Sequence, residues 1–128
     1  MPPGAVHADI SGMSGTVRIK PSGKNIHVSF RGELNEDLVN RAHSSIEELV
    51  ERMPDCSLLV DTLQLERPPL KLALNMKEFS ARLNGRVRKV ATVVDNSHNS
   101  ILARIAFTSI RRHTLFNDSA QALDWLAG

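Results

Sequence analysis

Two apolar stretches decide the fold: residues 57–61 (Ser-Leu-Leu-Val-Asp) and residues 90–94 (Val-Ala-Thr-Val-Val). Each is short and almost continuously apolar, which is typical of a strand buried on both faces of a parallel sheet. Between them, from Pro68-Pro69 to about Asn84-Gly85, apolar side chains recur at steps of three and four residues, which predicts a helix. A helix between two such strands indicates a right-handed parallel crossover and therefore an α/β fold.

The chain before these strands is expected to start the sheet with an antiparallel hairpin. Residues 16–20 and 25–31 alternate apolar and polar side chains, so each strand buries one face. The intervening Pro-Ser-Gly-Lys of residues 21–24 suits a tight turn. Residues 1–14 are small, polar and marked by Pro and Gly, and we expect a flexible leader there, followed by a single domain over residues 15–128.

The hairpin is followed by the clearest amphipathic pattern of the chain. Apolar side chains recur at helical spacing over residues 34–53. Asn35 is placed to cap this helix, and Glu36 and Asp37 lie where the helix dipole favours negative charge. Pro54 ends it.

Two more helices complete the expected architecture. One runs from about residue 98 to 112 and buries a face that includes Ile101, and the other is capped by Asp118. Residues 113–116 can form only a short strand between them. The expected fold is α/β, with a mixed, mostly parallel sheet of about five strands and about four helices.

Composition limits the classes of protein. The chain has 128 residues, 41% of them hydrophobic and 23% charged, which fits one globular domain. Its only cysteine, Cys56, excludes an internal disulfide framework, and no apolar run reaches the roughly 18 residues of a membrane span, so we expect a cytoplasmic protein. The chain has four Phe, one Trp and no Tyr. No basic segment is interleaved with aromatic rings that could stack on bases, so nucleic-acid binding is not expected.

Charge is unevenly distributed along the chain. Residues 31–61 hold eight acids and three bases, whereas residues 82–112 hold seven bases and one acid. Such a dipolar molecule could steer an acidic partner or pack against its own copy. The alternative is two solvated helix faces of opposite charge.

Several stretches stand in the order and spacing of a known family. They are residues 30–34 (Phe-Arg-Gly-Glu-Leu), 58–61 (Leu-Leu-Val-Asp), 89–95 (Lys-Val-Ala-Thr-Val-Val-Asp) and 116–126 (Phe-Asn-Asp-Ser-Ala-Gln-Ala-Leu-Asp-Trp-Leu). Over about residues 15–127 the chain resembles the bacterial SpoIIAA-like family of small STAS/SEC14-like proteins. The resemblance implies a STAS-like fold and a regulatory or interaction module, and the SEC14-like label implies a lipid or apolar ligand.

The wider superfamily includes anti-sigma-factor antagonists that are phosphorylated on a serine in the motif Asp-Ser-Ser-Gly-Leu-Gly. The resemblance aligns this motif with residues 61–66. Asp61 matches, but Leu63 replaces the phosphorylated serine and the glycines are missing. The phosphoserine switch is therefore not carried over, and only Thr62, one place earlier, remains as a weak phosphorylation candidate.

The expected ligand-binding edge lies beyond the carboxyl ends of the parallel strands. Asp61 and Thr62 end one strand, and Asp95 and His98 follow the next. If the strands are neighbours, two close carboxylates could act as acid and base; alternatively, both cap local turns. His98 beside Ser97 lacks a nucleophile elbow and a third orienting residue. With no glycine-rich phosphate loop and no metal-ligand spacing, no cofactor and no metal are expected.

The helix after Pro68-Pro69 has apolar residues on two sides. Leu70 and Leu74 face about 200° away from the stripe that starts at Leu72. They either lie under the preceding loop or the first helix, or form an exposed patch that contacts a second copy, another protein or a lipid.

Three hypotheses follow for the function. The first is a non-enzymatic interaction module that binds a protein partner or forms a homodimer, with the second helix and the loop over residues 61–69 as its working surface. The second is a carrier of a small apolar ligand between the second and third helices, with candidate linings Leu74, Met76, Phe79, Ile105 and Phe107. The third is a hydrolase-like enzyme that uses Asp61, Asp95 and His98.

Overall fold

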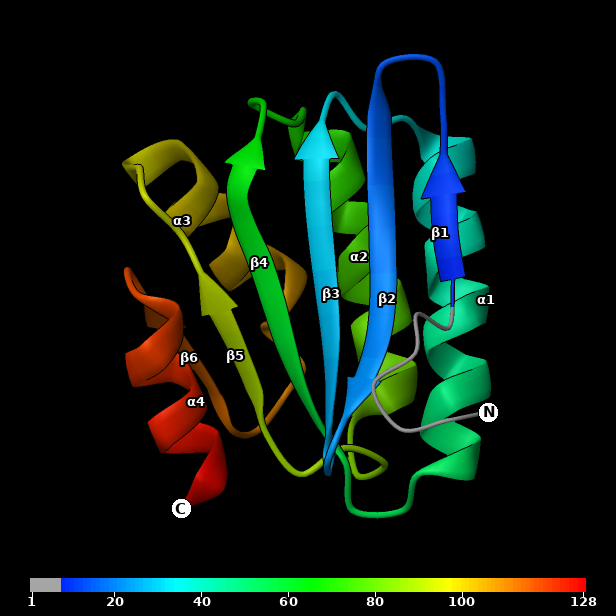
Figure 1. The fold of residues 1–128 in the computed structure, drawn as a ribbon. Coiled ribbons are helices and arrows are strands. Elements are labelled where there is room, and N and C mark those ends of the chain that lie inside the picture. The colour runs from blue at the N-terminus through cyan, green and yellow to red at the C-terminus, as the bar shows by residue number, and fades with distance from the viewer. Residues whose placement is uncertain (1–7) are drawn as a thin grey trace.

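The computed structural model describes residues 8–128 and is built around one six-stranded sheet (Figure 1). The strands lie in the order in which they occur along the chain: β1 (Ala8–Ser11), β2 (Gly15–Ser22), β3 (Asn25–Gly32), β4 (Ser57–Leu65), β5 (Val90–Val93) and β6 (His113–Phe116). The helices are α1 (Glu36–Arg52), α2 (Leu70–Leu83), α3 (Ser97–Ala106) and α4 (Ser119–Ala127).

The pairing of the strands confirms the predicted topology. β2 and β3 form the antiparallel hairpin, and the pairs β3–β4, β4–β5 and β5–β6 are parallel. The two stretches that decide the fold are neighbours, with Leu59 opposite Ala91 and Asp61 opposite Val93. Because parallel strands share a direction, their carboxyl ends meet at one edge of the sheet, from which the chain enters α2 and α3.

The sixth strand, β1, corrects the expectation of an unstructured leader over residues 1–14. β1 pairs antiparallel with β2 and turns Ala8 and Ile10 toward the core, where they pack against the main hydrophobic cluster. Four residues are too few for alternation to be recognised among the small and polar residues around them. Residues 1–7 of the expected leader lie outside the described residues.

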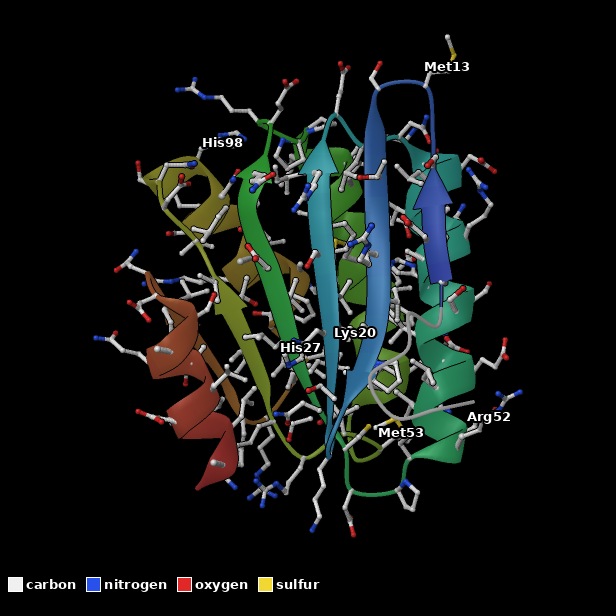
Figure 2. All side chains as sticks on the ribbon, viewed as in Figure 1. Met13, Lys20, His27, Arg52, Met53 and His98 are labelled. Atoms are coloured by element: carbon white, nitrogen blue, oxygen red, sulfur yellow. The ribbon has the colours of Figure 1, made fainter. Side chains whose placement is uncertain are left out.

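The two faces of the sheet are covered differently. Helices α1, α2 and α3 lie behind the sheet in Figure 1 and enclose the main core, whereas α4 lies in front. α4 packs Ala122 and Leu126 against Leu59, Ala91 and Val93 of β4 and β5. Within the described residues no helix covers the front of β1–β3, and polar side chains occupy that face, among them Lys20 and His27 (Figure 2).

Side-chain caps set the ends of the helices as the sequence predicts. Asn35 Oδ1 accepts a hydrogen bond from the Leu38 amide at 2.8 Å, and α1 stops before Pro54. Asp118 Oδ1 accepts from the amides of Ala120 and Gln121 at the start of α4. These bonds satisfy amides that the first turn of a helix leaves unpaired.

The third helix differs from its prediction in length and in its buried face. α3 ends at Ala106 rather than near residue 112, and Ile101 is 59% exposed. Leu102 and Ala106, four residues apart, lie on the buried side, so Ile101, one position and about 100° away from Leu102, points outward. Ile110 is buried, but from the loop after the helix.

Candidate functional site

The candidate site lies at the edge where the parallel strands end and the chain enters α2 and α3. Asp61 and Thr62 lie in β4, and Asp95 and His98 lie where the chain passes from β5 into α3. His98 is found at the same edge as the ends of β3 and β4 (Figure 2). The structure thus places the predicted polar residues on one side of the sheet, as the topology requires.

The two carboxylates at this edge are engaged locally. Asp61 Oδ1 accepts a hydrogen bond from the Leu63 amide at 2.9 Å, an Asx-type contact within the strand end. Asp95 Oδ1 accepts from Asn96 Nδ2 at 2.8 Å, and Asp95 is exposed. These contacts match the local-capping alternative rather than a paired acid and base.

His98 joins two segments of the edge. Its Nε2 lies 3.0 Å from the carbonyl oxygen of Pro68, at the end of the loop that leads into α2. Because a carbonyl can only accept, Nε2 must carry the proton in this contact. Asn96 caps the same helix through a bond from the Asn99 amide to its Oδ1 at 2.8 Å. His98 therefore ties the start of α3 to the start of α2.

Thr62 is unsuited to modification in this conformation. It is 7% exposed, and its hydroxyl donates a hydrogen bond to the Val93 carbonyl at 2.7 Å. A kinase would have to break this bond and pull the end of β4 out of the sheet. Leu63, aligned with the superfamily's phosphorylated serine, is 37% exposed and has no hydroxyl.

The second helix exposes one of its two apolar sides. Leu72 and Phe79 are buried against the sheet and α1, whereas Leu70 is 53% exposed and Leu74 is 48% exposed. Neither the preceding loop nor α1 covers them. The alternative that the sequence leaves open is thus resolved in favour of an outward-facing pair of leucines, one turn apart at the start of α2.

An apolar cavity lies between α2, α3 and the sheet, and its volume is about 40 Å³. Of the five linings expected from the sequence, Met76 and Phe107 reach it; Leu74, Phe79 and Ile105 do not. The Oδ1 atom of Asn99, a lining residue 3% exposed, has no hydrogen-bond partner among the described residues. Sites for drug-sized ligands measure roughly 300–1,000 Å³, so this cavity is too small for such a ligand.

A wider polar groove of about 600 Å³ runs between α1 and α2. One of its lining residues, His43, is 5% exposed and stacks on Phe79 with ring centroids 3.9 Å apart. Burial, followed by the nearby Arg82, lowers the pKa of His43 to about 4, so the ring is neutral at pH 7. Sequence reasoning missed this histidine, although it stands on the apolar stripe of α1, four residues after Val39 and three before Ile46.

Residues 8–128 contain neither a cluster of metal-binding side chains nor a helix suited to cross a membrane. No group of three or more His, Cys, Asp or Glu side chains in this range is arranged to hold a metal ion. No helix in it combines the length and apolarity that a membrane crossing requires.

The chain is similar to a family of known sequences and to two solved structures. The model of the SpoIIAA-like family matches residues 25–127. An uncharacterised protein from Shewanella loihica with a SpoIIAA-like fold superposes with a TM-score of 0.64 at 19% identity, covering 91% of this chain and 98% of the other. An anti-sigma factor antagonist from Mycobacterium paratuberculosis superposes with a TM-score of 0.61 at 17% identity, covering 93% and 100%. No curated protein gave a significant match.

Proposed function

Because the chain belongs to the SpoIIAA-like family, we propose that it is a non-enzymatic regulatory module of the bacterial cytoplasm that acts by binding a partner protein. The observation that carries this proposal is the exposure of Leu70 and Leu74 on α2. Adjacent apolar side chains that a domain leaves in water mark a contact surface, because burying them in a complex is favourable. The neighbour from M. paratuberculosis supports the same class of function, since it is an anti-sigma factor antagonist.

The polar side chains of the strand edge form contacts that position the backbone around them. Asp61 accepts a hydrogen bond from the Leu63 amide near the end of β4, and Asp95 accepts one from Asn96 before α3. His98 Nε2 donates to the Pro68 carbonyl. In our proposal these residues position the loop before α2 and hold the start of α2, with its leucines, against α3.

The partner in this proposal is a protein other than a second copy. Self-association through the same leucines would form a homodimer about a two-fold axis, and this is the main competing occupant of the face. A small apolar ligand is not proposed, because the cavity of about 40 Å³ between α2 and α3 is too small for one.

Exchanging both leucines for glutamate tests the proposal. We expect the Leu70→Glu/Leu74→Glu variant to lose the protein that co-purifies with the wild-type chain from its native host. Each half-buried leucine contributes about 1 kcal/mol or more at an interface, so the affinity measured with the purified partner should fall at least about thirty-fold. The measurement is calorimetric titration of the purified partner, with multi-angle light scattering to report any dimer.

Leu123→Glu is the matched control, because Leu123 is a 38% exposed leucine on α4, which covers the other face of the sheet. This variant should bind the partner as the wild type does. The proposal fails if the double variant and the control bind equally well, or if the wild-type chain is a strict monomer and no protein co-purifies. A dimer that only the double variant disrupts would assign the face to self-association instead.

A further inference from the structure

The acidic side chains of α1 are neutralised within the molecule. All five acids of the helix lie within 4 Å of a base, so α1 itself offers little net negative charge to a partner. The pairs are Glu36–Lys71 at 3.4 Å, Asp37–Arg41 at 3.2 Å, Glu47–Arg82 at 2.9 Å, Glu48–Arg52 at 3.1 Å and Glu51–Arg86 at 3.8 Å.

Several bases of the opposite half, together with Lys24, lie where the parallel strands begin, at the end of the sheet away from His98. Backbone hydrogen bonds place them on neighbouring strands: the Ser57 amide bonds the Lys24 carbonyl at 3.1 Å, and the Leu58 amide bonds the Lys89 carbonyl at 2.9 Å. The Val90 amide bonds the Arg112 carbonyl, also at 2.9 Å. Neighbouring strands lie roughly 4.8 Å apart, so the backbone positions from Lys24 to Arg112 span roughly 14 Å across β3–β6.

Two of these bases form hydrogen bonds within the domain. Lys89 Nζ donates to the Trp125 carbonyl at 2.6 Å, and an Arg88 guanidinium nitrogen donates to the Leu126 carbonyl at 2.7 Å. Both bonds hold the end of α4 against the sheet. Burial lowers the pKa of Lys89, and the positive charges of Arg112 and Arg88 lower it further, which shows how closely the cations are set.

The remaining bases at this edge are exposed and lack an internal acid. Lys24, Arg111 and Arg112 form no ion pair among the described residues. The acids nearby are Asp55 in the loop before β4 and Glu51, which pairs with Arg86. We call Lys24, Arg111 and Arg112 the basic edge; it repels its own members and would be stabilised by anions from outside.

We propose that the basic edge binds an acidic segment of a protein in extended conformation. Such a segment places every second carboxylate on one side, at steps of roughly 6.6 Å, so three carboxylates match the span from Lys24 to Arg112. Arginine guanidinium groups bind carboxylates through two parallel hydrogen bonds, which suits Arg111 and Arg112. This site lies at the other end of the strands from the start of α2 and does not depend on the proposed function.

Other anionic partners fit this edge less well. A membrane surface would favour large apolar side chains beside the bases. Exposed residues of this kind, such as Leu63 near the carboxyl end of β4 and Ile101 in α3, lie toward the other end of the strands. Single-stranded nucleic acid needs exposed rings on which bases stack, and the described aromatic side chains are buried or half-buried. A duplex binds by neutralising many phosphates, more than three cations supply.

The test is fluorescence anisotropy with a labelled twelve-residue peptide of alternating Glu and Ser. We expect saturable binding by the wild-type chain at 50 mM salt, weaker binding at 200 mM salt, and at least tenfold weaker binding by Arg111→Glu/Arg112→Glu. This variant should still fold, because removing the positive charge of Arg112 reduces its repulsion of Lys89. Circular dichroism checks that it does, and Arg111→Gln/Arg112→Gln should give an intermediate loss if the double Glu variant is unstable.

The matched control is Arg67→Glu/Lys77→Glu, which changes the net charge equally at two exposed positions in the loop before α2 and in α2. Its affinity for the peptide should stay within twofold of the wild type. Equal weakening in both variants would show a non-specific effect of net charge and overturn the proposal, as would the absence of saturable binding at 50 mM salt. Tighter binding to a twelve-base-pair DNA duplex or to phosphatidylglycerol vesicles than to the peptide would also overturn it.

Discussion

Gly32→Ala is expected to lower the free energy of unfolding by more than about 3 kcal/mol. Gly32 ends β3 with a φ of +72°, which alone strains an L residue. A Cβ there would also lie 2.4 Å from the carbonyl oxygen of Ser14, a backbone atom that no rotamer change can move. The close approach occurs where the start of β2 passes the end of β3.

Gly85→Ala separates the cost of backbone strain at a positive φ from the cost of a steric clash. Gly85 has a φ of +85°, but a Cβ there meets no atom within 4 Å. The control should therefore cost only the backbone strain, about 1 kcal/mol. Urea denaturation followed by circular dichroism measures both variants. Equal losses of stability in the two variants would contradict the close approach of the Ser14 carbonyl to Gly32.

The second large effect is a loss of stability in acid that depends on the buried His43 and the half-buried His113. Burial lowers the pKa values of His43 and His113 to about 4, with further lowering by Arg82 and Arg104 respectively. The unfolded chain, with histidine pKa values near 6.5, binds more protons between these values, so stability falls as pH falls from about 6.5 to about 4. Each ring contributes a loss on the order of 3 kcal/mol over this window. His27, whose pKa burial and Lys20 also lower, acts in the same direction.

His43→Leu should remove its share of this dependence. The Nε2 atom of His43 is buried without a hydrogen-bond partner among the described residues, so a leucine of similar volume should leave stability at pH 7.5 within about 1 kcal/mol of the wild type. At pH 4.5 the variant should be the more stable protein. Denaturant titrations at both pH values measure the difference, and parallel pH profiles for variant and wild type would contradict the burial of a neutral ring at this position.

The sequence predicts the layers of this fold better than its surfaces. Residues 57–61 and 90–94 are almost continuously apolar, and such runs have few stable positions other than the middle of a covered sheet. Caps such as Asn35 and Asp118 are local, so their chemistry can be recognised from a few neighbouring residues. β1 was missed because a four-residue edge strand depends on its partner β2 rather than on its own pattern.

The parts of the candidate site that could not be predicted depend on packing between distant segments. Periodicity shows that α2 has two apolar sides, but only the positions of α1 and the preceding loop decide that Leu70 and Leu74 remain exposed. Charge counts reveal two oppositely charged halves. Only the ion pairs show that the acids of α1 are internally neutralised while Arg111 and Arg112 are not.

Site-specific photo-cross-linking in the native host tests whether the exposed side of α2 contacts the partner. A benzophenone amino acid replaces Leu74 in one variant and Leu123 in the other, and each is irradiated in the native host before purification under denaturing conditions. We expect a discrete adduct with one other protein from position 74 and none from position 123. Adducts from position 123 with position 74 silent would contradict it.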